Sequence, residues 1–200
     1  MENKDKLIED LRYVKRIIED SKNLVVDNGI GFIIWGLIII VGLLGTYIDI
    51  VLSGTQFSLE IWIILILGGW LYSLYKWYIN RDRKKRTTFA GRIMSATWLA
   101  SGIAMTIIGF IGTYSGAYKS VYISPIIAVI LGIAFYVSSF LYENKLMKFI
   151  APLWWLGSIY MFFFPGIHTI LVMVFLMLFL QVIPGIILYK KYKREQVEIG

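Results

Sequence analysis

The stretch Arg81-Asp82-Arg83-Lys84-Lys85-Arg86 carries five basic residues in six and lies between two long apolar runs. Membrane proteins keep lysine and arginine in the connections that face the cytoplasm. The stretch is therefore predicted to be a cytoplasmic turn between two membrane-crossing hairpins. Its basic side chains are also expected to contact anionic lipid headgroups. They are Arg81, Arg83, Lys84, Lys85 and Arg86.

Apolar segments dominate the rest of the chain. It is 58% hydrophobic and only 16% charged, whereas soluble domains are roughly a quarter charged. A segment of about 20 apolar residues matches a hydrocarbon core of about 30 Å. The expected fold is an all-α polytopic membrane protein with six transmembrane helices in three in-out-in hairpins. The six segments lie at about Ile30–Ile48, Ile61–Ile79, Ile93–Tyr114, Val121–Tyr142, Phe149–Phe164 and Thr169–Tyr189.

The placement of charge predicts the orientation. Of the 20 lysines and arginines, all but Lys119 lie in the N-terminal segment, in two connections or near the C-terminus. Both termini are therefore expected in the cytoplasm, with the protein in a bacterial or archaeal cytoplasmic (inner) membrane. The connections near Ser53, Ser115 and Gly166 are expected to face outward. The net charge of +7 is attributed to this topology, and nucleic acid is not an expected partner.

These segments divide the chain into three regions. A cytoplasmic amphipathic helix is expected first, then a transmembrane bundle, then a short cytoplasmic tail. The regions are residues 1–28, residues 29–192 (with hairpins 29–80, 91–144 and 148–192) and residues 193–200.

The N-terminal region has the pattern of an amphipathic helix. Its apolar residues recur at alternating spacings of four and three, which places them on one face. The opposite face mixes acidic and basic residues, and this favours contact with protein over contact with lipid. The partner could be the bundle itself, another copy of the chain or a soluble cytoplasmic protein. The predicted seam is Leu7, Leu11, Val14, Ile18 and Val25.

Two motifs recur in corresponding helices. Gly42-Leu43-Leu44-Gly45-Thr46-Tyr47 in the first segment matches Gly109-Phe110-Ile111-Gly112-Thr113-Tyr114 in the third. Ile66-Leu67-Gly68 in the second matches Ile130-Leu131-Gly132 in the fourth. Two matches in register indicate a duplicated hairpin, and the third hairpin is interpreted as a diverged copy.

No Asp, Glu, Lys, Arg or His lies in the middle of any segment. Intramembrane charges usually mark ion paths and proton relays, so transport coupled through carboxylates is not expected. The chain has no cysteine and one histidine, His168, and it contains no catalytic, cofactor-binding or metal-binding motif. The sequence therefore predicts a non-enzymatic protein with no cofactor and no metal.

Polar and aromatic residues within the segments carry further expectations. Hydroxyls such as that of Ser158 should bond a nearby carbonyl or a neighbouring helix, whereas Gln181 is a lone amide that needs a partner. Trp98 and Trp154 are interpreted as members of an interfacial aromatic belt. Pro184-Gly185 is expected to kink the last helix or to open its hydrogen-bond ladder.

The sequence is compatible with two functions. In the first, the hairpins anchor a regulatory or scaffolding protein, and the N-terminal helix and basic loops bind a cytoplasmic partner or a second copy. In the second, the bundle is a passive channel or carrier for a neutral, apolar or lipid-like solute, because glycine-rich, aromatic helices can line a path without charge. Whether the bundle is solid or hollow bears on the choice.

Overall fold

The computed structural model describes residues 29–54, 59–81, 89–141 and 145–199, together with Arg12. These residues are helical apart from short turns, with no strand among them. The α-helices are α2 (Ile30–Ser53), α3 (Leu59–Arg81), α4 (Phe89–Thr106), α5 (Ile123–Leu141), α6 (Lys145–Phe163), α7 (His168–Met177) and α8 (Ile183–Ile199). The π-helical segment η1 (Ile107–Gly112) continues α4, η3 (Leu178–Val182) joins α7 to α8, and the 3₁₀ turn η2 (Ser120–Tyr122) precedes α5.

Five helical stretches are long and apolar enough to cross a membrane. They are Ile30–Ser53, Leu59–Ile79, Gly91–Gly112, Ser120–Leu141 and His168–Arg194. The remaining expected segment is also helical, but its apolar part, Met147–Phe163, is shorter. The prediction of an all-helical chain with several membrane-spanning helices is confirmed at this level.

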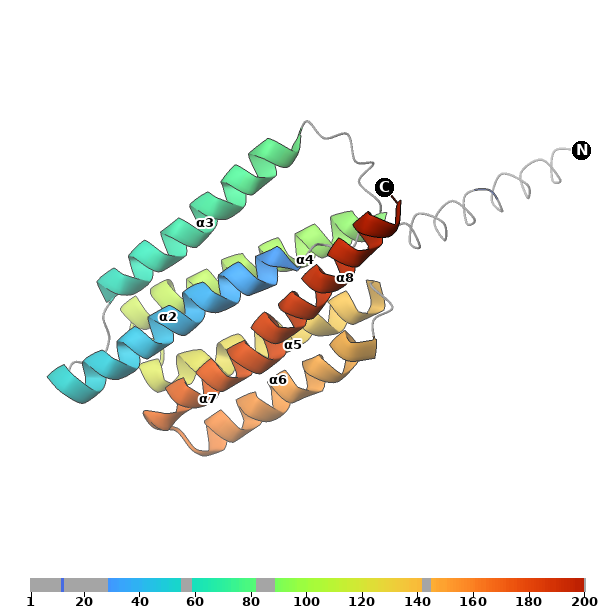
Figure 1. Cartoon of the computed structure of the whole chain (residues 1–200). Helices are drawn as coiled ribbons and strands as arrows, with labels where there is room; N and C mark the ends of the chain where they lie inside the picture. The colour runs from blue at the N-terminus through green and yellow to red at the C-terminus, as the bar shows by residue number, and fades with distance from the viewer. Residues whose placement is uncertain (1–11, 13–28, 55–58, 82–88, 142–144, 200) are drawn as a thin grey trace, which may run out of the picture.

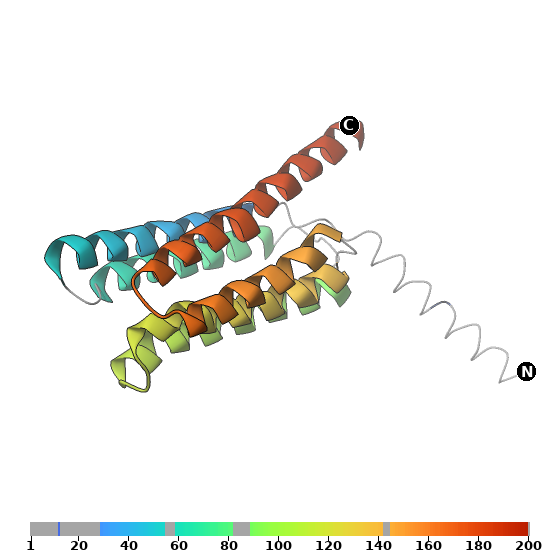
Figure 2. The same ribbon diagram turned by 90° about the horizontal axis from the view of Figure 1, so that it is seen from below.

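The helices form two layers (Figure 1, Figure 2). One layer contains α3, α2 and the continuous rod of α7, η3 and α8, and the other contains α4, α5 and α6. Backbone contacts are dense within each layer, above all between α5 and α6 and between α2 and α7, and they are sparse between the layers. The two layers are therefore joined mainly by large side chains.

The third hairpin is split between the layers, unlike the first two. α6 packs on α5, whereas α7 and α8 pack on α2. Two close approaches explain the split. A Cβ atom at Gly132 of α5 would collide with the Trp155 indole of α6, and one at Gly29 would collide with the Gly185 carbonyl of α8. Glycine thus lets α6 press against α5 and lets α8 cross the start of α2.

An aromatic cluster that includes Phe32, in the first turn of α2, bridges the two layers. The Phe32 ring lies edge-on to Trp98 at 4.9 Å and stacks on Phe135 at 5.5 Å. Phe135 also stacks on Trp154, with ring centroids 6.1 Å apart. Trp154 is fully buried and Trp98 packs against the same core. The interpretation of Trp154 as an interfacial belt residue is therefore wrong, because neighbouring helices enclose it. Trp98 is half-buried, and its place in the belt stays a prediction.

The repeated Gly-Thr-Tyr motif makes the same local bond in both copies. The Thr46 hydroxyl donates to the Gly42 carbonyl at 2.9 Å, and the Thr113 hydroxyl donates to the Gly109 carbonyl at 2.7 Å. Threonine in a membrane helix satisfies its hydroxyl in this way without a partner helix. The motif therefore has matching local geometry in the first and third expected segments.

The last helical rod widens just before Pro184. Residues Leu178–Val182 are π-helical, and a proline lacks the N–H of a regular helix and crowds the carbonyl four residues back. The hydrogen-bond ladder is thus altered directly before the proline, whereas a kink or an opening of the ladder was expected. The same turn contains Gln181, and π-helical turns often occur at functional sites.

Candidate functional site: a cavity between the helix layers

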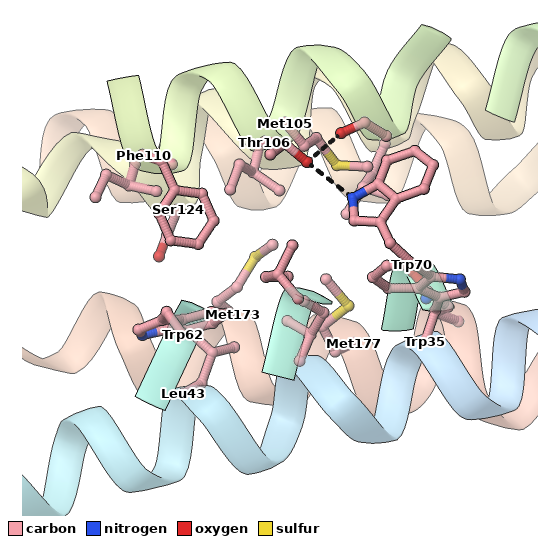
Figure 3. A pocket seen from close by; sticks show the side chains of 18 of the residues that line it. Trp35, Leu43, Trp62, Trp70, Met105, Thr106, Phe110, Ser124, Met173 and Met177 are labelled. Carbon is pink, nitrogen blue, oxygen red and sulfur yellow. Dashed lines mark hydrogen bonds between the residues drawn. The ribbon is translucent and has the colours of Figure 1, made fainter. Parts of the chain in front are cut away.

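A cavity of about 1350 Å³ lies between the two helix layers. Side chains from α2, α3 and α7 line one side, and side chains from α4 and α5 line the other (Figure 3). On α2 the lining extends from Gly31 to Ile50, which corresponds to about 28 Å at 1.5 Å per residue. The cavity therefore has nearly the depth of a bilayer's hydrocarbon core, which is roughly 30 Å.

The cavity wall is mostly apolar. Leu43, Met173 and Met177 approach it from the layer of α2. Met105 approaches it from α4, and Phe110 from η1 (Figure 3). Methionine side chains are flexible and adapt to irregular shapes. Such a wall favours an apolar occupant, because water against it would lack hydrogen-bond partners.

Four tryptophans of the wall donate their indole N–H groups to hydroxyls on neighbouring helices. Two of these bonds join α2 to α3, one joins α3 to α4, and one joins α4 to α5. Interhelical hydrogen bonds of this kind help membrane helices select partners, because apolar surfaces alone discriminate little in lipid. The bonds are Trp35 to Ser73 (3.0 Å), Trp62 to Thr46 (2.8 Å), Trp70 to Thr106 (3.4 Å) and Trp98 to Ser138 (3.1 Å).

The flank between α3 and α4 is the least closed side of the cavity. Among the described residues, α3 packs on α2 but makes few backbone contacts with α4, and Figure 1 shows α3 standing apart from α4. The Trp70 side chain bridges the two helices. Its indole donates to Thr106, and its ring lies against Gly102, where an added Cβ would be only 3.3 Å away. The Trp70 side chain thus contacts α4 across a flank with few backbone contacts.

Gln181 is the least satisfied polar residue of the wall. It is 4% exposed, and its Nε2 lies 3.5 Å from the Phe32 carbonyl oxygen, at the limit of a hydrogen bond. Its Oε1 has no partner among the described residues. A buried unsatisfied polar group costs about 1–3 kcal/mol. The partner expected from the sequence is thus only half supplied.

The lining is almost free of charge. Among the described residues that line the cavity, Lys119 is the one with an ionised side chain at neutral pH. His168 lies outside the lining and packs edge-on to Tyr160, with ring centroids 6.3 Å apart. No cluster of three or more potential metal-ligating side chains occurs in the part of the chain that the structure describes. The arrangement can hold a ligand through apolar contact and a few hydrogen bonds.

The binding residues predicted from the sequence lie elsewhere. Arg83, Lys84, Lys85 and Arg86 and the seam formed by Leu7, Leu11, Val14, Ile18 and Val25 fall outside the described residues. Arg81 ends α3, and its side chain also falls outside them. Sequence reasoning did not find the cavity. Its tryptophans and methionines follow ordinary helical spacing, and only the separation of the two layers shows that they surround a space.

No protein-family model, curated protein or solved structure matches this chain.

Proposed function

We propose that this protein is a passive carrier or channel that binds a neutral, apolar or lipid-like solute within the bilayer. The observation that carries the proposal is the cavity between the helix layers. The space is partly open and mostly apolar, so a hydrocarbon molecule from the bilayer can occupy it. A protein that holds a solute needs such a space, whereas a scaffold does not.

The cavity wall suggests the chemistry of the solute. Its methionine, leucine and aromatic side chains favour a hydrocarbon chain. Ser124 lines the cavity and can bond a small polar group on that chain. The absence of Asp and Glu from the described lining residues speaks against coupling to protons or cations. We propose a non-enzymatic role for the same reason that the sequence favours one, because it contains no catalytic motif.

We place the route of the solute between α3 and α4. The sparse backbone contacts on this flank, and the bridging position of the Trp70 side chain, support the assignment. A solute dissolved in the bilayer would reach the cavity sideways and would not need to cross the polar surface. Displacement of one indole ring is a smaller change than separation of two packed helices.

The proposed membrane arrangement has six crossings in three in-out-in hairpins, with both termini and residues 81–86 in the cytoplasm of the inner membrane. The starts of α3, α5 and α7 lie at the same end of the bundle (Figure 1), which supports alternating crossings. The matching threonine bonds of the first and third segments support duplication of the first two hairpins.

Binding can be tested with the full-length chain in nanodiscs and a brominated fatty alcohol as the probe. Bromine quenches tryptophan fluorescence on contact, and five of the seven tryptophans line the cavity. We expect saturable quenching in addition to the linear quenching from probe in the bilayer. Proteoliposomes should also exchange a fluorescent lysolipid between leaflets faster than empty liposomes do.

Two double variants supply a matched control. Met105→Trp with Met173→Trp obstructs the cavity from both layers, and the saturable quenching should be lost. Ile103→Trp with Phe175→Trp adds the same two residues to exposed positions of α4 and α7, and the quenching should remain. Equal quenching in both variants, each monodisperse and helical by circular dichroism, would remove the basis of the proposal.

The regulatory or scaffolding role stays a prediction from the sequence pattern of the N-terminal helix. It can be tested by deleting residues 1–26. Loss of a co-purifying protein or of self-association is expected if this role is correct, and unchanged associations would count against it.

A further inference from the structure

Lys119 departs from the charge pattern of the whole chain. It is the one basic residue in a connection that the positive-inside rule places outside the cytoplasm. It is also the one lysine or arginine among the described residues that line the cavity. The two observations are independent, since the first comes from the sequence and the second from the fold. Together they place an isolated positive charge at one end of an apolar space.

The surroundings of Lys119 suit a negative group. Ser120 and Ser124 line the same end of the cavity and offer hydroxyl donors, and Ser124 lies near Phe110 in Figure 3. The Lys119 side chain is exposed, so its ammonium group stays hydrated while its stem borders apolar wall. Neither Asp49 nor Glu60 lines the cavity.

The remainder of the space suits a single hydrocarbon chain. From the end at Lys119 the lining continues through Met105 and Met173 to Met177 and Gln181, and these residues are neutral. An anion buried along this path would lose its hydration without compensation. Among the described lining residues, only Lys119 can favour a negative headgroup, and it lies at one end of the cavity.

We propose that the solute is a single-chain amphiphile with an anionic headgroup, such as a fatty acid or a lysophospholipid. Its headgroup lies beside Lys119, and its chain lies between the helix layers. This inference rests on the proposed function, which requires only that the cavity accept an apolar or lipid-like solute. It adds a charge and an orientation for that solute.

The test compares three brominated probes with the same hydrocarbon chain: dibromostearate, the corresponding alcohol and the corresponding amine. Saturable tryptophan quenching is measured for each with the full chain in neutral nanodiscs. We expect the carboxylate to bind about fivefold more tightly than the alcohol, and the amine to bind most weakly. Added salt should weaken binding of the carboxylate and leave binding of the alcohol unchanged.

Variants at Lys119 make the comparison specific. In Lys119→Gln the carboxylate probe should bind no more tightly than the alcohol probe. In Lys119→Glu the amine probe should bind most tightly and the carboxylate probe most weakly. Lys148→Gln is the matched control, because Lys148 is also exposed but lies outside the cavity lining, and it should retain the order of the parent chain.

The outcomes separate this inference from the function beneath it. If none of the three probes gives saturable quenching, the proposed function itself fails. If all three bind equally and Lys119→Glu changes nothing, the cavity binds lipid-like molecules but the assignment of an anionic headgroup is overturned.

Discussion

The adjacent serines Ser138 and Ser139 on α5 differ in their hydrogen bonds, because in the described part of the chain only Ser138 accepts one from a tryptophan indole. Ser138 accepts from the Trp98 indole at 3.1 Å and donates to the Ala134 carbonyl at 2.6 Å. Its neighbour Ser139 donates to the Tyr136 carbonyl at 2.6 Å, and no indole bond to it is found among the described residues. The two serines therefore have different structural roles despite their adjacency.

Ser138→Ala should destabilise the protein by about 1 kcal/mol, because the Trp98 N–H loses its acceptor in a dry environment. Ser139→Ala should cost less, since the carbonyl that it releases is already part of the helix ladder. Thermal unfolding in detergent, followed by circular dichroism, gives both values. A larger loss at Ser139 would contradict the assignment of the indole bond as the important contact.

Gln181→Leu should have the opposite effect on stability. The substitution removes an amide whose Oε1 lacks a described partner, so the solute-free protein should become more stable by about 1 kcal/mol. Reduced stability of the solute-free variant would indicate that the amide is fully bonded in the folded protein.

Tyr118 gives the protein a pH dependence outside the membrane-spanning helices. Burial raises the pKa of its phenol above the usual 10.0, and a hydrogen bond with Thr113 lowers that pKa by a smaller amount. The hydroxyl donates to the Ile108 carbonyl in the π-helical segment η1. A folded-state pKa above the unfolded value means that this contribution to stability is complete below about pH 10 and declines as pH rises through the folded-state pKa.

The unfolding temperature should therefore fall more steeply above about pH 10 in the parent chain than in Tyr118→Phe. The measurement is a series of thermal unfolding curves in alkaline buffers. The difference in tyrosinate absorbance between the two proteins should show that Tyr118 ionises at a higher pH than a free phenol. Identical pH profiles would refute the assignment.

At the scale of elements, the two copies of the Ile-Leu-Gly motif place their glycines in different surroundings. Gly132 faces the Trp155 indole, whereas an added Cβ at Gly68 would meet no atom within 4 Å. Gly132→Ala should cost about 1–3 kcal/mol through overpacking. Gly68→Ala should be neutral or stabilising by up to about 1 kcal/mol, because alanine favours the helix. Equal effects on thermal stability would show that α5 and α6 are not in close contact.

The helices themselves could be predicted well from the sequence, because long apolar runs leave few alternatives in a membrane. The expected start at Ile30 is the observed start of α2, and the expected end at Phe164 is one residue beyond the end of α6. Their pairing could not be predicted. It depends on which glycines meet a bulky partner, such as Gly132 with Trp155, and that information is not contained in periodicity. Lys119 was visible as an exception in the sequence, but its position at the cavity required the fold.

At the scale of the whole molecule, sparse backbone contact between the layers leaves room for α3 to move relative to α4. The chain lacks cysteine, so an introduced pair is unique. Trp70→Cys with Thr106→Cys, joined by a short bifunctional thiol reagent, should slow probe association about tenfold, a change of about 1.4 kcal/mol in barrier. Cleavage of the linker should restore the rate. An unchanged association rate after complete cross-linking would exclude access through this flank.

The split of the third hairpin has a consequence for how the chain is made. α2 emerges from the ribosome first, yet the helices that cover it, α7 and α8, emerge last. A nascent chain released before Gly185 would leave the face of α2 that surrounds Gly29 and Gly36 without its natural neighbours. Until synthesis ends, the insertion machinery or membrane lipid must cover that face. The native tertiary arrangement therefore forms only after the C-terminal helices enter the membrane.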